Sequence, residues 1–173
     1  MMEIRRIPLD HIEKFVSLLA DAYPALPLTS TADRERSETR FRAIQEHDDS
    51  VDLYGAYRDD KLVGTMMFHS YTMTMLSTRI PVLGLGMVAV DLCLKKEKIA
   101  KEMVSFFLNH ARLRGYHLVA LYPFRPDFYR KMGFGIGTKM ASYTLSPASL
   151  PKGSRINVSH HRYRGPICCI VRP

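Results

Sequence analysis

The sequence has few cysteines and no long apolar segment. Its three cysteines include the adjacent pair Cys168 and Cys169, which is not the pattern of a disulfide framework, so we predict a reducing, cytoplasmic compartment. No apolar run is long enough for a membrane span, and the N-terminal residues lack the apolar stretch of a signal peptide. The seven histidines and three cysteines show no metal-ligand spacing. These absences disfavour secreted, membrane-spanning and metal-dependent proteins.

The composition is that of a globular protein with an excess of positive charge. The 173 residues are 46% hydrophobic and 24% charged, which is enough apolar material for one domain with a sizeable core. The net charge of +8 favours an anionic partner, such as a nucleotide cofactor, a nucleic acid or an acidic surface. Charge alone does not choose among these three.

The spacing of apolar residues predicts an α/β chain. We expect strands at 3–7, 52–57, 61–69, 71–76, 80–90, 117–122 and 139–145. We expect helices at 9–22, 32–46, 99–113 and 127–132. The strand, helix and strand between 80 and 122 predict a right-handed parallel crossover. Prolines and a glycine interrupt every pattern after residue 145, so we assign 1–145 to one domain and 146–173 to a tail or the start of a second domain.

A buried strand that leads through a basic loop into a helix is the first candidate site. The apolar run 84–90 precedes Lys95, Lys96 and Lys98, which lie where the helical pattern begins. The free N–H groups and the positive dipole end of a helix N-terminus attract anions. Lysines at that position oppose the dipole, and a bound anion would relieve this. The alternative interpretation is a solvated cluster of charges.

A second motif gives this basic loop a family context. Residues 128–134 read Phe-Tyr-Arg-Lys-Met-Gly-Phe, and the loop 95–100 precedes them across a β-α-β unit. Over residues 3–145 the chain resembles GNAT acetyltransferases, which move an acetyl group from acetyl-CoA to an amine. More narrowly, 53–57, 62–66 and 121–134 resemble the N-terminal domain of Eis-like (enhanced intracellular survival) enzymes. The resemblance implies the GNAT acyl-CoA N-acyltransferase fold, with a mixed, splayed sheet and flanking helices.

The resemblance also implies where acetyl-CoA binds. Backbone groups of the central strand would pair with the pantetheine arm, and these residues are Met87, Val88, Ala89 and Val90. The pyrophosphate would be held by Lys95, Lys96, Lys98, Ile99 and Ala100. This chain departs from the family pattern because Lys98 replaces the usual glycine and Lys95 replaces Gln or Arg. Glycine permits close backbone approach, so Lys98 either crowds the phosphates or supplies charge from its side chain.

By the same resemblance Tyr129 is the candidate general acid. A phenol with a pKa of about 10 is a reasonable proton source for a departing thiolate of about 8.5. The alternative role for Tyr129 is that of a packed aromatic side chain. The general base stays open between His69 and Asp91, and each is also explained as an ordinary strand-end or loop residue. We expect His110, on the apolar face of the long helix, to be a core residue.

We predict acetyl transfer from acetyl-CoA to a primary amine, either aminoglycoside-like or the amine of a lysine. Eis-like enzymes resemble one another in using their own C-terminal carboxylate as a base, and no motif assigns that role to Pro173. One rival is an incomplete GNAT domain that binds CoA or a partner without turnover. The other is a basic nucleic-acid-binding module, suggested by the arginines and histidines of 155–164. The acceptor and the formation of a homo-oligomer stay open.

Overall fold

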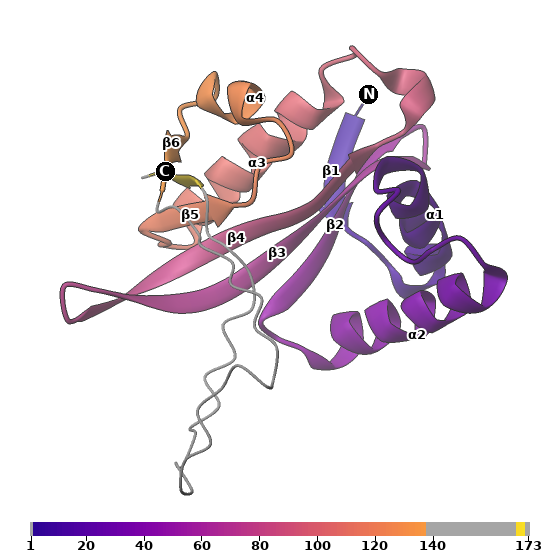
Figure 1. Cartoon of the computed structure of the whole chain (residues 1–173), viewed down its shortest axis with the longest axis horizontal. Helices are drawn as coiled ribbons and strands as arrows, with labels where there is room; N and C mark the ends of the chain where they lie inside the picture. Colours follow the sequence, from indigo (N-terminus) through magenta and orange to yellow (C-terminus); the bar gives the residue numbers. More distant parts are fainter. Residues whose placement is uncertain (1, 138–168, 172–173) are drawn as a thin grey trace, which may run out of the picture.

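A mixed sheet with helices on both faces organises the chain (Figure 1). The computed structural model describes residues 2–137 and 169–171. Within them the strands follow the order β1-β2-β3-β4-β5-β7-β6, with β4 and β5 parallel and every other pair antiparallel. The strands are β1 (Met2–Arg6), β2 (Val51–Arg58), β3 (Lys61–Met75), β4 (Thr78–Val90), β5 (Leu118–Leu121), β6 (Gly135–Ile136) and β7 (Cys169–Val171). The helices are α1 (Ile12–Ala22), α2 (Thr31–His47), α3 (Ile99–Leu113) and α4 (Pro126–Arg130), with 3₁₀ turns η1 (Leu9–His11) and η2 (Leu92–Leu94).

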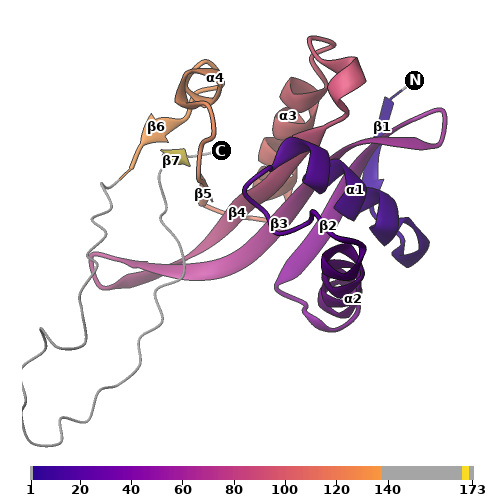
Figure 2. The ribbon, with the colours of Figure 1, turned by 45° about the vertical axis from the view of Figure 1, so that its right-hand side comes forward.

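The sheet separates two apolar layers, and helices cover each of them. Figures 1 and 2 show α1 and α2 over one face of the sheet and α3 over the other. Successive side chains of a strand point to opposite faces, so Phe68 packs against Phe107 of α3, whereas Met67 belongs to the cluster beneath α1. Helices α1 and α3 therefore stabilise the fold by burying the apolar stripes that their sequences predict.

Local signals that end and begin helices behave as the sequence predicts. Gly115 takes a φ of 75° directly after α3, the left-handed conformation that glycine adopts most readily. Pro126 stands at the first position of α4, where its missing N–H costs nothing. The α3 helix joins the parallel strands β4 and β5, so the parallel arrangement of the predicted crossover is confirmed.

The expected pair of strands at 61–69 and 71–76 is wrong. Both belong to β3, which pairs with β4 in one continuous ladder from Gly64–Val90 to Met75–Thr78. The connecting turn lies at Leu76 and Ser77, with φ values of 47° and 66°, and not at 77–79. Leucine is not a usual residue for this left-handed geometry, which is why composition gave no signal for it.

The C-terminal part holds one further predicted strand and two observed strands that the sequence did not predict. The strand expected at 139–145 lies outside the described residues, as does most of 146–173. The short strands β6 and β7 were not predicted, because no alternation of apolar residues announces either of them. Their pairing brings residues 135–136 and 169–171 together beside β5.

Candidate active site

The central strand β4 has an open edge where the sheet splays. It pairs with β5 over Val82–Leu85, and among the described residues this parallel pairing goes no further. On the other edge, Ala89 pairs with Thr65 of β3 and the Asp91 N–H donates to the Val63 carbonyl at 2.9 Å. Because backbone groups alternate between edges, the N–H and C=O of Val90 point away from β3. The predicted splay is confirmed, and it exposes peptide groups to an extended amide-bearing ligand.

A bulge interrupts β4 at the start of this open edge. Met87 has a φ of 50°, and the register with β3 shifts between Thr65 and Met67. The Thr65 hydroxyl donates to the Met87 carbonyl at 3.3 Å. The smooth strand expected at 84–90 is therefore wrong at Met87. Bulges re-aim backbone groups and occur often beside active sites.

Tyr23, which follows α1, is a residue of this region that the sequence did not reveal. Its hydroxyl donates to the Val88 carbonyl at 2.9 Å. Burial raises the pKa of Tyr23, and the hydrogen bond with Val88 opposes that effect. A tyrosine in a connection between helices carries no pattern of its own, because its partner is distant in sequence and is a backbone carbonyl.

The loop between β4 and α3 holds its lysines in unusual backbone conformations. Lys96 and Lys98 have φ values of 76° and 64°, which favour glycine. Lys98 is the N-cap of α3, and its carbonyl accepts from the Glu102 N–H at 3.1 Å. The position where GNAT proteins carry glycine thus has the glycine-like conformation even with lysine present. Lys95, Lys96 and Lys98 are exposed.

The two remaining predicted loop residues differ in what they offer a ligand. The Ile99 side chain is 2% exposed and belongs to the core beneath α3, so it presents only its backbone to the loop. Ala100 is half-buried in the first turn of the helix. Together the first-turn N–H groups and the lysine side chains form a site that fits a diphosphate.

An ion pair offsets the carboxylate that lies among the lysines of this loop. Glu97 lies between the lysines, and its carboxylate accepts a hydrogen bond from the Arg58 guanidinium at 2.5 Å. Arg58 ends β2, so the contact ties the loop to the sheet. The same pair raises the pKa of Arg58. Neutralising Glu97 leaves the loop electrostatically suited to an anion.

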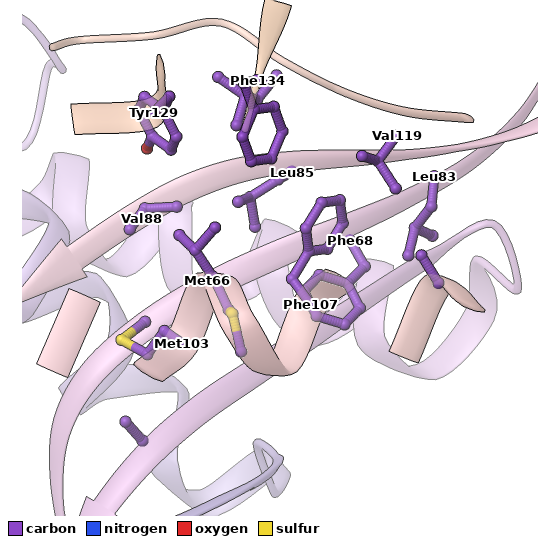
Figure 3. Close-up of a cluster of buried hydrophobic side chains, with 14 of the residues drawn as sticks. Met66, Phe68, Leu83, Leu85, Val88, Met103, Phe107, Val119, Tyr129 and Phe134 are labelled. Atoms are coloured by element: carbon purple, nitrogen blue, oxygen red, sulfur yellow. The ribbon is translucent and has the colours of Figure 1, made fainter. Parts of the chain in front are cut away.

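Tyr129 lies on α4, over the region where β4 and β5 separate. It is 2% exposed and contacts Phe124, Phe128 and Phe134 edge to face, with ring centroids 5.8, 5.0 and 5.7 Å away. Figure 3 shows it above Leu85 and Val88, with its hydroxyl oxygen on the Val88 side of the ring. Tyr129 is therefore a packed aromatic residue that also adjoins the open edge.

The candidate bases occupy different places. His69 is half-buried on β3, and Asp91 follows the last residue of β4. The Asp91 carboxylate accepts from the Cys93 N–H at 2.8 Å and so caps η2. His110 packs among aromatic rings, 5.5 Å from Tyr54 and 5.2 Å from Phe68, as expected for a residue of the apolar face.

Comparison with known families identifies the class of protein. The model of the acetyltransferase (GNAT) domain matches residues 3–137. The chain therefore belongs to the GNAT acetyltransferases, which use acetyl-CoA. Comparison with curated protein sequences finds no match.

Solved structures share the fold at low sequence identity. Glucosamine-6-phosphate N-acetyltransferase from Arabidopsis thaliana is 20% identical, with a TM-score of 0.65 over 84% of this chain and 99% of that one. A predicted acetyltransferase from Clostridium acetobutylicum, solved with acetyl-CoA, is 16% identical, with a TM-score of 0.68 over 83% of this chain and 96% of that one. Eis1 from Mycobacterium abscessus is 19% identical, with a TM-score of 0.63 over 80% of this chain.

The lengths of these proteins differ. This chain covers 32% of Eis1 and 32% of a probable N-acyltransferase from Enterococcus faecalis.

Among the described residues, no helix has the length and apolar character needed to cross a membrane.

Proposed function

We propose that this chain transfers an acetyl group from acetyl-CoA to a primary amine, such as an aminoglycoside-like amine or a lysine side chain. The observation that carries the proposal is the open edge of β4, which leads directly into the glycine-like loop at the start of α3. Within Met87–Val90, Val90 turns its N–H and C=O to that edge, where they suit an amide of the pantetheine arm. The N–H groups of 95–100 suit the pyrophosphate, and the lysine side chains add positive charge.

Tyr129 is the proposed general acid of this reaction. Its ring lies above Leu85 and Val88, beside the point where the open edge begins (Figure 3). When the amine nitrogen attacks the thioester carbon, the C–S bond breaks and the sulfur leaves as a thiolate. A neutral phenol next to that sulfur supplies the proton it needs. The surrounding phenylalanines exclude water and hold the ring in place.

A thiol-release assay tests the proposal. The chain is incubated with acetyl-CoA and, in turn, spermidine, a lysine-containing peptide and an aminoglycoside, and free CoA is measured against hydrolysis without acceptor. The variant Tyr129→Phe should lower kcat by about a hundredfold, the lower limit for loss of a general acid. Tyr122→Phe is the matched control, because Tyr122 is 66% exposed and should leave the rate unchanged.

The outcomes separate the alternatives. CoA binding by calorimetry without thiol release for any acceptor would contradict the enzyme and favour a CoA-binding domain. Full activity of Tyr129→Phe would remove Tyr129 from the mechanism. The basic residues 155–164, which suggested nucleic acid, lie outside the described residues. Retention on DNA that CoA does not compete would favour that rival.

The sequence also supports four further proposals about this protein. They are a narrower Eis-like relationship, a cytoplasmic location, a domain boundary after residue 145, and assembly as a homo-oligomer. Eis1 of Mycobacterium abscessus supports the first of these as one of several GNAT structures with the same fold. Sedimentation of the purified chain addresses the oligomer, and limited proteolysis addresses the boundary.

A further inference from the structure

Two glycines in β4 leave room for side chains of β3 just before the bulge. Gly84 pairs with His69. A Cβ built on Gly86 would lie 3.4 Å from His69 Nε2, and one built on Gly84 would lie 2.2 Å from the Tyr71 hydroxyl. The imidazole therefore covers the backbone of β4 directly beside Met87, where the open edge begins.

The open edge also limits where a thioester can lie. If the pyrophosphate is at the start of α3, the pantetheine arm runs back along β4 from Val90 toward Met87. Four strand residues span about 13 Å at about 3.3 Å each. Beyond that the arm meets Leu85, whose edge is occupied by Leu121 of β5. The reacting carbonyl is therefore confined to the neighbourhood of Gly86–Val88.

His69 and Tyr129 approach this neighbourhood from opposite faces of the sheet. Tyr129 belongs to the core cluster on the α3 side, together with Leu85 and Val88. Phe68 also packs on α3, so its neighbour His69 points to the other face, which carries α1 and α2. An amine arriving on the α1 side would meet the imidazole, while the sulfur leaves beside the phenol.

We propose that His69 is the general base that takes a proton from the attacking amine. This inference rests on the acetyl transfer proposed above. Asp91, the other candidate, lies at the far end of the open edge, and its carboxylate is engaged with the Cys93 N–H. Position therefore favours His69 over Asp91.

The surroundings of His69 suit this role. Burial lowers the pKa of His69, and the negative charge of Asp48 raises it in part. The neutral imidazole, which can accept a proton, therefore predominates at neutral pH. Tyr71 is the other titratable group on this face of β3, and burial raises its pKa, so it stays uncharged. Asp48, whose carboxylate accepts from the Ser50 N–H at 2.9 Å, would stabilise the imidazolium that forms.

The protons and bonds balance in the proposed step. A protonated primary amine gives one proton to His69, and its lone pair forms the C–N bond as the C–S bond breaks. Tyr129 protonates the departing sulfur. The second proton lost from the nitrogen restores the phenol through solvent, and His69 releases its proton to solvent. The net products are the amide, CoA thiol and one proton.

The test compares His69→Gln with His110→Gln, because both histidines are half-buried and only one adjoins β4. With the best amine of the panel, His69→Gln should lower kcat/KM at neutral pH by about a hundredfold and remove the acidic limb of the pH profile. The loss should be about tenfold smaller with hydrazine, a weakly basic amine that needs less help from a base. His110→Gln should keep the wild-type pH profile. CoA affinity and the unfolding midpoint of both variants establish that folding and cofactor binding persist.

Each result decides something different. If the wild type transfers acetyl groups and His69→Gln keeps its rate and pH profile, His69 is not the base and the proposed function stands. An equal loss with hydrazine and with the basic amine also overturns the role. If the wild type binds CoA and acetylates no amine, the proposed function itself fails. Should His69→Gln unfold, His69→Asn and the NMR titration of the wild-type imidazole, with and without CoA, replace it. A ring that titrates normally and does not respond to CoA then refutes the proposal.

Discussion

Lys98 allows the backbone of the proposed pyrophosphate loop to be tested separately from its charge. It begins α3 with a φ of 64°, a left-handed conformation that residues other than glycine adopt only rarely. The variants Lys98→Ala and Lys98→Gly both remove the ammonium group. They differ only at the backbone, because alanine keeps the Cβ that makes this conformation costly and glycine does not.

The expected difference in stability follows from two opposing effects. The left-handed conformation costs an L-residue about 1–2 kcal/mol. A glycine at this position avoids that cost but destabilises the folded state by about 0.5–1 kcal/mol, because glycine loses more conformational entropy on folding. Lys98→Gly should therefore be about 0.5–1 kcal/mol more stable than Lys98→Ala. The melting temperature should be higher by about 2 °C for a chain of this size. Lys98→Ala should remain close to the wild type, since both carry the same backbone strain.

Urea unfolding of the three proteins, followed by circular dichroism, measures this difference. CoA titrations measure the second consequence, because both variants lose the same charge and should lose the same affinity at low salt. Equal stability of the alanine and glycine variants would refute the left-handed conformation at position 98. A glycine variant that binds CoA much more tightly than the alanine variant would show instead that a side chain crowds the phosphates.

Two other predictions concern stability. Phe107 is fully buried, so Phe107→Ala should lower the free energy of unfolding by about 3–5 kcal/mol, whereas Leu113→Ala at an 80% exposed position should change it by less than about 0.5 kcal/mol. Comparable losses in denaturant melts would contradict the core assignment. Burial lowers the pKa of His69 and, with help from Arg114, that of His110, so the unfolded chain binds more protons. Stability should fall as the pH drops below the unfolded value of about 6.5 toward the folded pKa values. Replacing both histidines with glutamine should flatten that dependence in pH-dependent thermal melts.

The sequence predicted most elements because their signals are local. The apolar spacing of α1 and α3, Gly115 after α3 and Pro126 at the start of α4 all act within a few residues, and each was confirmed. The predicted position of the turn was wrong because the left-handed conformation of Leu76 is imposed by the strands on either side of it. The sequence did not predict the bulge at Met87 for a similar reason, because the bulge depends on the register between β4 and β3.

The sequence by itself determined the family, because the loop at 95–100 and the motif at 128–134 are local and correctly ordered. Only the tertiary structure decided which groups meet at the open edge of β4. The Tyr23 contact with Val88, the Arg58 pair with Glu97 and the position of His69 over Gly86 all join residues from different elements. Such contacts depend on strand register and helix packing, which no single segment encodes.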